Sequence, residues 1–284
     1  MQSIIVDEFI GQQDYLLISD VHWDNPKCDR TLLKKHLDQA VKRNAKILIN
    51  GDLFCIMQGL TDKRGSKGQI RPEHVGDDYF DLVAESAIEF FKPYAHHLLV
   101  IAEGNHESSV KRKGESDILA RFVYGMNALT GSKIHFGSYT GWVVFNGVQS
   151  KQSAKRSSFK MKYHHGFGGG GVVTKGVIQN QRMDSYTEGA DCIWMGHVHE
   201  MYHILSVSDG IEHNSRTGYR LKRRVRHHVR TGTYKDESSG SGYHEEKGRP
   251  VKPMGGYWMT LSMVDEMKDG IRAVHIEPTF TMAL

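Results

Sequence analysis

Short apolar runs alternate with helical patterns along the first half of the chain. Polar residues bound each run, which is typical of strands that are buried on both faces of a sheet. The runs cover residues 15–19, 46–50, 98–102 and 191–195.

Three segments between these runs carry apolar residues at the three-to-four spacing of an amphipathic helix. The first follows Asp29, a capping residue, and is built on Leu32, Leu33, Leu37, Ala40 and Val41. The second covers residues 79–91 and stops before Pro93, and the third covers residues 116–129. This alternation of strand and helix predicts right-handed βαβ units and a largely parallel sheet.

The second half of the chain is rich in strand patterns and predicts a second, more antiparallel sheet packed on the first. Its segments are divided by two pairs with turn character, Asn146-Gly147 and Asp209-Gly210. The segments cover residues 134–148, 201–207, 257–264 and 271–281.

Composition and length predict one folded domain over residues 1–284, because 39% apolar and 25% charged residues are ordinary globular values. Surface insertions are expected near 58–76 and within 208–256, where stretches such as 236–253 are rich in glycine, serine and charge. The amino terminus does not resemble a signal peptide, and no stretch is apolar enough to span a bilayer. Three scattered cysteines favour a reducing compartment, so we expect a cytoplasmic protein with no membrane partner and no thiolate zinc site.

Polar clusters directly follow several of the apolar runs. Residues just past the carboxyl ends of neighbouring strands converge on one crevice of an open α/β sheet, so groups distant in sequence are expected to meet there. The clusters are Asp20-Val-His22, Gly51-Asp52, Gly104-Asn105-His106-Glu107, His164-His165-Gly166 and Gly196-His197-Val198-His199.

The side chains of these clusters are imidazoles, carboxylates and one amide. Nitrogen and oxygen ligands of this mixture suit manganese, iron or zinc, and seventeen histidines in the chain make a metal site the first question to ask. Each cluster alone is a common turn or capped loop, but their fixed order at successive strand ends favours a shared site. A carboxylate such as Asp52 can bridge two cations, and paired metals can hold a hydroxide that attacks phosphorus in line.

The order of these clusters resembles the signature of the calcineurin-like metallophosphoesterase superfamily. The resemblance implies an α/β fold of two packed mixed β-sheets flanked by helices, in a four-layer αββα sandwich. It also implies two divalent metal ions, Mn²⁺ above all, with Fe, Zn or Ni as alternatives. By this likeness one metal would be held by Asp20, His22, Asp52 and His199, and the other by Asp52, Asn105, His197 and one of His164 or His165.

The same resemblance assigns roles beside the metals. His106 would protonate the leaving oxygen or stabilise the phosphoryl charge, and Glu107 would orient it. Cys55 stands where the family often has an acidic or amide residue, which would weaken the support of the bridging Asp52. Spacing leaves His164 and His165 unresolved, with His165 favoured because Gly166 follows it.

Substrate signals point to a phosphate ester, with DNA or RNA as the favoured partner. Residues 166–171 are glycine-rich, so their backbone amides can approach a phosphate, although a flexible turn explains them equally well. Residues 220–230 are the most basic run and read as a strand with a cationic face that includes Arg224 and Arg226. Basic residues of the insertion near 58–76 would flank the site from the other side, and the likeness to small phage or bacterial members extends loosely to metal-dependent repair nucleases.

Several functions stay open at this level. The leading hypothesis is a metal-dependent phosphodiesterase or nuclease acting on nucleic acid or a nucleotide. The enzymatic alternative is a phosphomonoesterase, and the alternatives of other classes are a non-catalytic scaffold with the same fold and a basic nucleic-acid-binding module. His106 speaks against the scaffold, because a scaffold has no need of a leaving-group acid. The sequence leaves the oligomeric state open.

Overall fold

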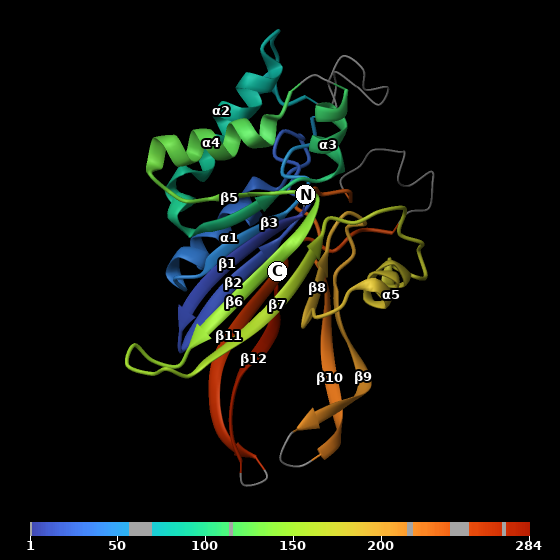
Figure 1. The fold of residues 1–284 in the computed structure, drawn as a ribbon. Helices are drawn as coiled ribbons and strands as arrows, with labels where there is room; N and C mark the ends of the chain where they lie inside the picture. Colours follow the sequence, from blue (N-terminus) through green and yellow to red (C-terminus); the bar gives the residue numbers. More distant parts are fainter. Residues whose placement is uncertain (1, 57–69, 114–115, 215–217, 239–249, 269–270) are drawn as a thin grey trace.

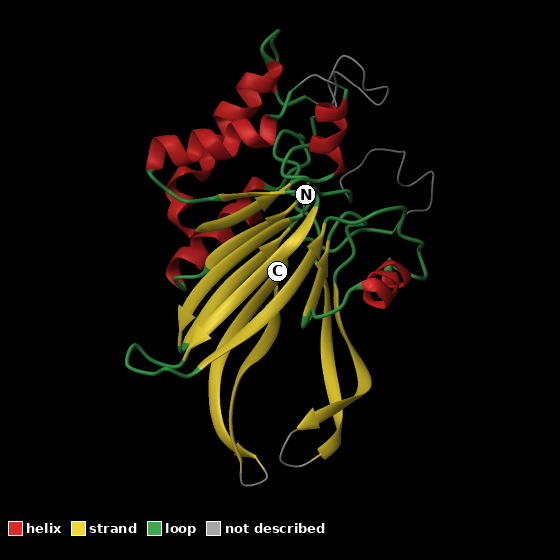
Figure 2. Cartoon of the chain, in the orientation of Figure 1, coloured by secondary structure: helices red, strands yellow, loops and turns green. Residues whose placement is uncertain are grey.

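The computed structural model describes residues 2–56, 70–113, 116–214, 218–238, 250–268 and 271–284. Two mixed six-stranded sheets face one another, and helices flank them (Figures 1 and 2). The predicted α/β sandwich of two mixed sheets is confirmed. Among the described residues, no helix is long and apolar enough to cross a membrane.

The first sheet has the strand order β1-β6-β7-β8-β10-β9. Its only antiparallel pairs are β6 with β7 and β10 with β9, and the other neighbours are parallel. The strands are β1 (Ser3–Ile10), β6 (Thr140–Val148), β7 (Arg156–His164), β8 (Cys192–Met195), β9 (Tyr202–Asn214) and β10 (Gly218–Arg230).

The second sheet has the strand order β12-β11-β2-β3-β4-β5. The strands β2 to β5 run parallel, as the alternating pattern predicts, and β11 is antiparallel to both β2 and β12. The strands are β2 (Gln12–Ile18), β3 (Lys46–Asn50), β4 (Leu98–Ala102), β5 (His135–Gly137), β11 (Gly256–Lys268) and β12 (Ile271–Ala283).

The helices α1 to α4 pack on the outer face of the second sheet, and α5 lies beside the first sheet (Figure 1). The three predicted helices are confirmed: the carboxylate of Asp29 accepts from two backbone amides at the start of α1, and α2 ends two residues before Pro93. The helices are α1 (Arg30–Lys42), α2 (Tyr79–Phe91), α3 (Asn105–Arg112), α4 (Ile118–Thr130) and α5 (Val177–Tyr186), with 3-10 turns at Pro72–His74 and Lys92–His97.

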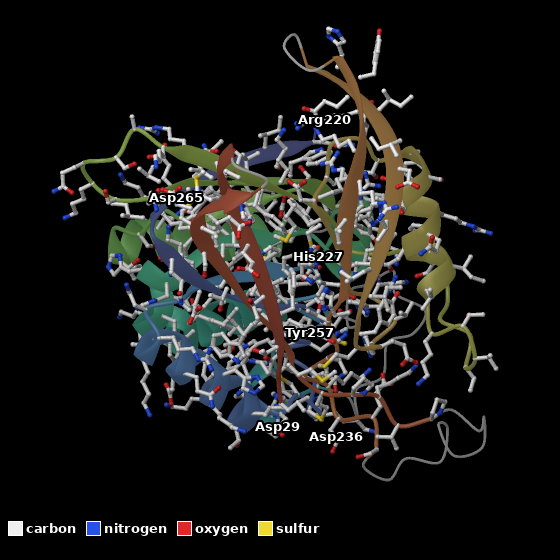
Figure 3. The ribbon with its side chains drawn as sticks, turned by 90° about the horizontal axis from the view of Figure 1, so that it is seen from below. Asp29, Arg220, His227, Asp236, Tyr257 and Asp265 are labelled. Carbon is white, nitrogen blue, oxygen red and sulfur yellow. The ribbon has the colours of Figure 1, made fainter. Side chains whose placement is uncertain are left out.

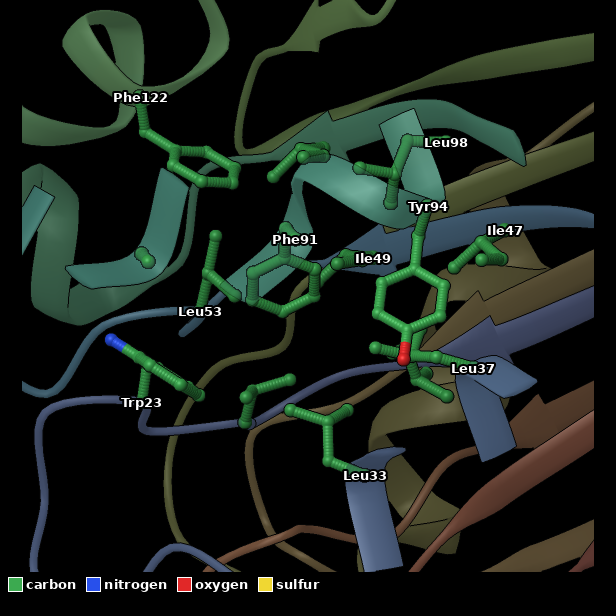
Figure 4. Close-up of a cluster of buried hydrophobic side chains, with 14 of the residues drawn as sticks. Trp23, Leu33, Leu37, Ile47, Ile49, Leu53, Phe91, Tyr94, Leu98 and Phe122 are labelled. Atoms are coloured by element: carbon green, nitrogen blue, oxygen red, sulfur yellow. The ribbon is translucent and has the colours of Figure 1, made fainter. Parts of the chain in front are cut away.

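Two main cores explain why the predicted strands are apolar on both faces. In β3, Ile47 and Ile49 pack against the helices in the cluster of Figure 4, whereas Leu48 points into the core between the sheets. Successive residues of a strand point to opposite faces, so a strand between two cores must be apolar throughout. With the two sheets packed face to face, the carboxyl ends of their parallel strands lie at a common edge of the sandwich.

Several details differ from the sequence-based expectations. The segments 257–264 and 271–281, expected in a second and more antiparallel sheet, form β11 and β12 beside β2, and each sheet has two antiparallel pairs among the described residues. The pairs Asn146-Gly147 and Asp209-Gly210 lie inside β6 and β9 and form no turn. The missing side chain of Gly147 leaves room for Phe9 and Met263, since a Cβ there would lie 2.8 Å from the Phe9 ring. Within the insertion expected at 208–256, residues 208–214 of β9 and residues 218–230 of β10 pair as antiparallel strands, and residues 215–217 and 239–249 lie outside the described residues. The same holds for 57–69 of the insertion expected near 58–76.

Candidate metal centre

The predicted cluster residues follow strands of both sheets at one edge of the sandwich. Asp20 and His22 follow β2, Asp52 follows β3, and Asn105 begins α3 after β4. The first sheet contributes His165 after β7 and a histidine pair after β8, namely His197 and His199.

The structure brings these side chains together. Three groups each have ligand atoms within 4.8 Å of one another, and the groups overlap through His22 and Asp52. The groups are Asp20 with His22 and His199, His22 with Asp52 and His106, and Asp52 with His165 and His197. The convergence predicted from strand ends is therefore present, and Asp52 lies where two of the groups meet.

The backbone at these positions is strained. Five of the predicted ligands have positive φ angles between 50° and 74°, a region that costs a residue with a side chain about 1 to 3 kcal/mol. They are Asp20, His22, Asp52, His197 and His199. Only three other described residues that are not glycine share this conformation. Strain that gathers at one edge of a sheet is typical of a functional site.

Glycine at two positions permits the close approach. A Cβ on Gly104 would overlap the carboxylate and backbone of Asp52, and a Cβ on Gly196 would lie 2.6 Å from Asp20 Oδ2. Both glycines precede predicted ligands. They allow the chain segments that carry Asn105 and His197 to lie directly against the carboxylates.

Backbone carbonyls fix which nitrogen of each ring faces the centre. His165 Nδ1 donates to the Asn50 carbonyl at 2.7 Å, and His197 Nε2 donates to the Gly168 carbonyl at 2.9 Å. The opposite nitrogens, His165 Nε2 and His197 Nδ1, lie 3.1 and 2.6 Å from the amide of Asn105. Histidines that bind metals are usually held by such a second hydrogen bond.

Charges inside the group shift the pKa values strongly. Burial alone would lower the pKa of His165, but the carboxylates of Asp52 and Asp20 raise it to about 10. Burial opposes protonation of His199 too, yet its contacts with Asp20 and Glu237 raise its pKa to about 9. Despite its burial, Asp52 has a pKa well below the usual range because His165 and His106 surround it. The carboxylates therefore favour positive charge between them and the histidines.

The donor set fits a divalent cation. Asp20 Oδ1 and His22 Nδ1 are buried without a hydrogen-bond partner among the described residues, and His22 Nε2 lies 3.3 Å from His199 Nε2. Facing nitrogens and a carboxylate oxygen that makes no hydrogen bond, although it lies 3.4 Å from His199 Nε2, suit a cation placed between them. The residues present could hold divalent metal.

Comparison with known proteins agrees with this geometry. The profile of the calcineurin-like phosphoesterase family matches residues 14–201, which include every predicted ligand. The chain belongs to the calcineurin-like phosphoesterase family. The predicted superfamily is thereby confirmed, and the sandwich is that of a metallophosphoesterase.

Two solved structures are similar over nearly the whole chain, at low identity. GAP50, the anchor in the inner membrane complex of Plasmodium, is 12% identical, with 96% of this chain and 85% of that chain covered at a TM-score of 0.41. Vps29 of Chaetomium thermophilum is 9% identical, with 95% and 98% covered at a TM-score of 0.27. Likenesses of this size carry no functional argument. No curated protein matches the sequence.

Of the two adjacent histidines, the structure brings His165 into the centre. His165 Nε2 lies 3.2 Å from Asp52 Oδ2. His164 packs between the rings of Tyr139 and Phe167, and its Nδ1 accepts from the Gly166 amide at 3.0 Å. The geometry therefore favours His165 as the ligand.

The contacts of Glu107 differ from the expected role. Its carboxylate is buried and accepts from the backbone amides of Asp52, Phe54 and Gly104 at 3.2, 2.9 and 2.9 Å. These bonds hold the loop after β3 against the start of α3. His106 is oriented instead by a carbonyl, since its Nδ1 donates to Cys55 O at 2.6 Å.

The loop around Cys55 has support that the sequence did not indicate. The buried carboxylate of Asp24 accepts from the amides of Cys55 and Ile56 at 2.5 and 2.8 Å and from the Tyr79 hydroxyl at 2.6 Å. Asp24 thereby fixes the backbone at positions 55 and 56. The sequence signal that could have pointed to Asp24 was its position close to the predicted ligand His22.

Arg224 and Arg226, predicted to bind substrate, lie away from the histidines of the candidate metal centre. Both precede the stretch of β10 that pairs with β8, so they lie at the amino end of β8 and the centre lies at its carboxyl end. Arg224 forms an ion pair with Asp191 at 2.9 Å, and Arg226 pairs with Asp184. Their role in substrate binding stays a prediction.

Arg230 from the same basic run does reach the centre. Its buried guanidinium donates to the Gly196 carbonyl at 2.6 Å, directly before His197, and to the side chains of Asn180 and Gln179 at 2.7 and 3.1 Å. The sequence analysis included it only as part of the cationic face of the basic run 220–230. Arg230 differs from the other basic residues of this run because it is the last residue of β10 and lies opposite Met195.

A cavity of about 310 Å³ opens beside two of the histidines. Its lining includes the glycines that follow Phe167, and the charged side chains of Glu237 and Lys252. Glu237 Oε1 lies 3.4 Å from His199 Nδ1 and 3.9 Å from the ammonium of Lys235. Lys235 and Glu237 lie in a segment that the sequence suggested to be a surface insertion.

Proposed function

We propose that the chain is a phosphoester hydrolase whose active centre is a pair of divalent cations sharing Asp52. The observation that carries this proposal is the overlap of the ligand groups, because Asp52 lies within 4.8 Å of both His22 and the pair His165 and His197. A carboxylate between two sets of imidazoles suits two adjacent cations.

The two cations would divide the ligands between the sheets. One would be held by Asp20, His22, Asp52 and His199, and the other by Asp52, Asn105, His165 and His197. The mixture of nitrogen and oxygen donors favours Mn²⁺, with Fe, Zn or Ni as alternatives. Such cations supply Lewis acidity at phosphorus and lower the pKa of water.

The remaining chemistry belongs to His106. Its Nδ1 is tied to the Cys55 carbonyl, so its Nε2 faces the centre and lies 3.8 Å from Asp52 Oδ2. A protonated Nε2 at this place can donate to the oxygen that leaves phosphorus or to a phosphoryl oxygen. This role distinguishes a catalyst from a scaffold with the same fold.

For the substrate we propose a phosphodiester, of nucleic acid or of a nucleotide, with a phosphomonoester as the second candidate. The second candidate gains support from the ion pairs of Arg224 and Arg226, which neutralise much of the cationic face expected to bind a polyanion. A cavity of about 310 Å³ beside His197 also suits a compact substrate.

The test is a manganese-supplemented activity panel. It compares model monoesters and diesters with single- and double-stranded nucleic acid, for the parent and for Asp52→Asn and His106→Ala. Matched controls are Asp77→Asn and His96→Ala, which change exposed residues of the same types.

We expect hydrolysis that stops on chelation, that is lost in Asp52→Asn and that falls about 100-fold or more in His106→Ala. Both controls should keep the parent rate. Full activity of Asp52→Asn would refute the proposal. A steep loss of nucleic-acid cleavage with salt, absent for a small diester, would favour the polyanionic substrate.

A further inference from the structure

The segment 233–237, which follows β10, is fixed against the candidate metal centre. The Thr233 hydroxyl and the Tyr234 amide both donate to the carbonyl of Asp20, at 2.8 and 3.0 Å. Asp20 is one of the predicted ligands, so the segment begins in direct contact with the centre.

The loop before α1 holds the same segment. The Asp29 amide donates to the Tyr234 carbonyl at 2.8 Å. The Asp236 amide donates to the Lys27 carbonyl at 2.8 Å, and an isolated antiparallel bridge lies between these two bonds. Figure 3 shows Asp236 close to Asp29 at this junction. Backbone bonds to two other parts of the chain therefore decide where the side chains of the segment point.

Glu237 of this segment faces the predicted ligand His199. Its Oε1 lies 3.4 Å from His199 Nδ1 and 3.9 Å from the ammonium of Lys235. Residues two apart in an extended chain share a face, which places Lys235 and Glu237 on the same side of the segment. The side chains of His199 and Glu237 are only 13 and 12% exposed, so water screens their contact in part only.

The other ring nitrogen of His199 faces the centre. His199 Nε2 lies 3.4 Å from Asp20 Oδ1 and 3.3 Å from His22 Nε2. The two nitrogens of an imidazole point in divergent directions. Glu237 therefore reaches His199 on the side away from the ligand group of Asp20, His22 and His199.

The predicted ligand histidines differ in what their outer nitrogens meet. The outer nitrogens of His165 and His197 donate to backbone carbonyls at 2.7 and 2.9 Å. His22 Nδ1 has no hydrogen-bond partner in the part of the chain that the structure describes. At His199 the outer nitrogen meets a carboxylate, which fixes the tautomer of a metal-binding imidazole and raises its basicity.

We propose that Glu237 is a positioning residue of the metal centre and acts through His199. Its carboxylate accepts the proton of Nδ1, so that Nε2 presents a lone pair towards Asp20 and His22. The proposal rests on the proposed function, because it requires a divalent cation between these three ligands. Its effect is confined to that cation, since His165 and His197 are oriented by carbonyls.

The test is a titration of the metal-free full chain with Mn²⁺, in which electron paramagnetic resonance measures the free ion. The parent should bind two ions. Glu237→Ala should bind one of them about 10- to 100-fold more weakly and the other as tightly as the parent. Glu237→Gln should lie between the two, because its amide oxygen keeps the acceptor without the charge. Glu85→Ala, at an exposed position of α2, is the matched control and should bind both ions as the parent does.

A double variant separates positioning from a general effect of charge. When His199→Ala is already present, adding Glu237→Ala should leave the remaining Mn²⁺ affinities unchanged, because Glu237 acts only through the imidazole. Circular dichroism confirms that each variant is folded.

Four results would each overturn the proposal while leaving the proposed function intact. They are unchanged binding in Glu237→Ala, equal weakening of both ions, binding by Glu237→Gln as weak as that by Glu237→Ala, and a further loss in the double variant. A parent that binds no Mn²⁺ would refute the proposed function itself, and the positioning role with it.

Discussion

Replacing Arg230 by methionine tests how the fold holds the metal centre. The Arg230 guanidinium is buried, and its partners are neutral: two carbonyls, two side-chain amides, one hydroxyl and the Met195 sulfur. Methionine has a similar length but no donor. The change therefore removes all these hydrogen bonds and leaves the volume largely filled.

The size of the stability loss depends on which hydrogen-bond acceptors lose their last donor when Arg230 is replaced. Asn180 Oδ1 still accepts from the Tyr202 hydroxyl, and the carbonyls of Gly176 and Gly196 keep the amides of Gln179 and Val198. Gln179 Oε1 loses its described partner, and the shortest bond, to Gly196, disappears. Bonds to a charged donor contribute about 1.5 to 3 kcal/mol each, and removal of a buried cation recovers part of this. We expect a net loss of about 2 to 4 kcal/mol in the free energy of unfolding.

A second effect should appear at the metals. The Gly196 carbonyl that Arg230 holds precedes His197, so its release loosens a predicted ligand. Changes to residues that support metal ligands typically weaken metal affinity about 10- to 100-fold.

The assay combines urea unfolding of the metal-free protein with a manganese titration. Arg156→Met, at an exposed position, is the matched control and should change the unfolding free energy by less than about 0.5 kcal/mol. A loss below about 0.5 kcal/mol in Arg230→Met, together with unchanged manganese affinity, would refute the reasoning.

Three further predictions concern the ligands themselves. Because the pKa values of His165 and His199 are raised to about 10 and about 9, metal binding at pH 7 should release about two protons, and affinity should rise with pH up to about 10. Calorimetry in buffers of different ionisation enthalpy measures this, and no proton release would contradict it. His165→Ala should lose one of two bound metals while His164→Ala keeps both, as measured by elemental analysis after dialysis. The opposite result would make His164 the metal ligand in place of His165. Gly104→Ala should lower metal content and hydrolysis together because its Cβ overlaps Asp52, whereas Gly210→Ala, whose added Cβ would lie 3.7 Å from the nearest atom, should leave both unchanged. Equal behaviour of the two variants would remove the packing argument.

The sequence predicted those parts of the site that depend on local pattern. Asp52 and His197 each directly follow an apolar run, and the rule that parallel strand ends converge was sufficient to bring them together. The strand that contains Ile47 to Asn50 was also predicted correctly, because a strand between two cores leaves a continuous apolar pattern.

The contacts that support the ligands could not be predicted from the sequence, because they join residues that are distant in the chain. The bonds of Asp24 to Cys55, and of Arg230 to Gly196, depend on how the strands are ordered in each sheet. The error at Asn146-Gly147 has a similar cause, since a glycine inside a strand was required by the packing of Phe9 from another strand. Local turn preference gave the wrong answer where tertiary packing decided.

The most direct test of the dinuclear centre is anomalous diffraction from a crystal of the protein loaded with manganese. We expect two anomalous peaks about 4 Å apart on either side of the Asp52 carboxylate, one near Asp20, His22 and His199, and the other near Asn105, His165 and His197. Absence of manganese from this edge of the sheets, or a single ion that Asp52 does not touch, would contradict the account.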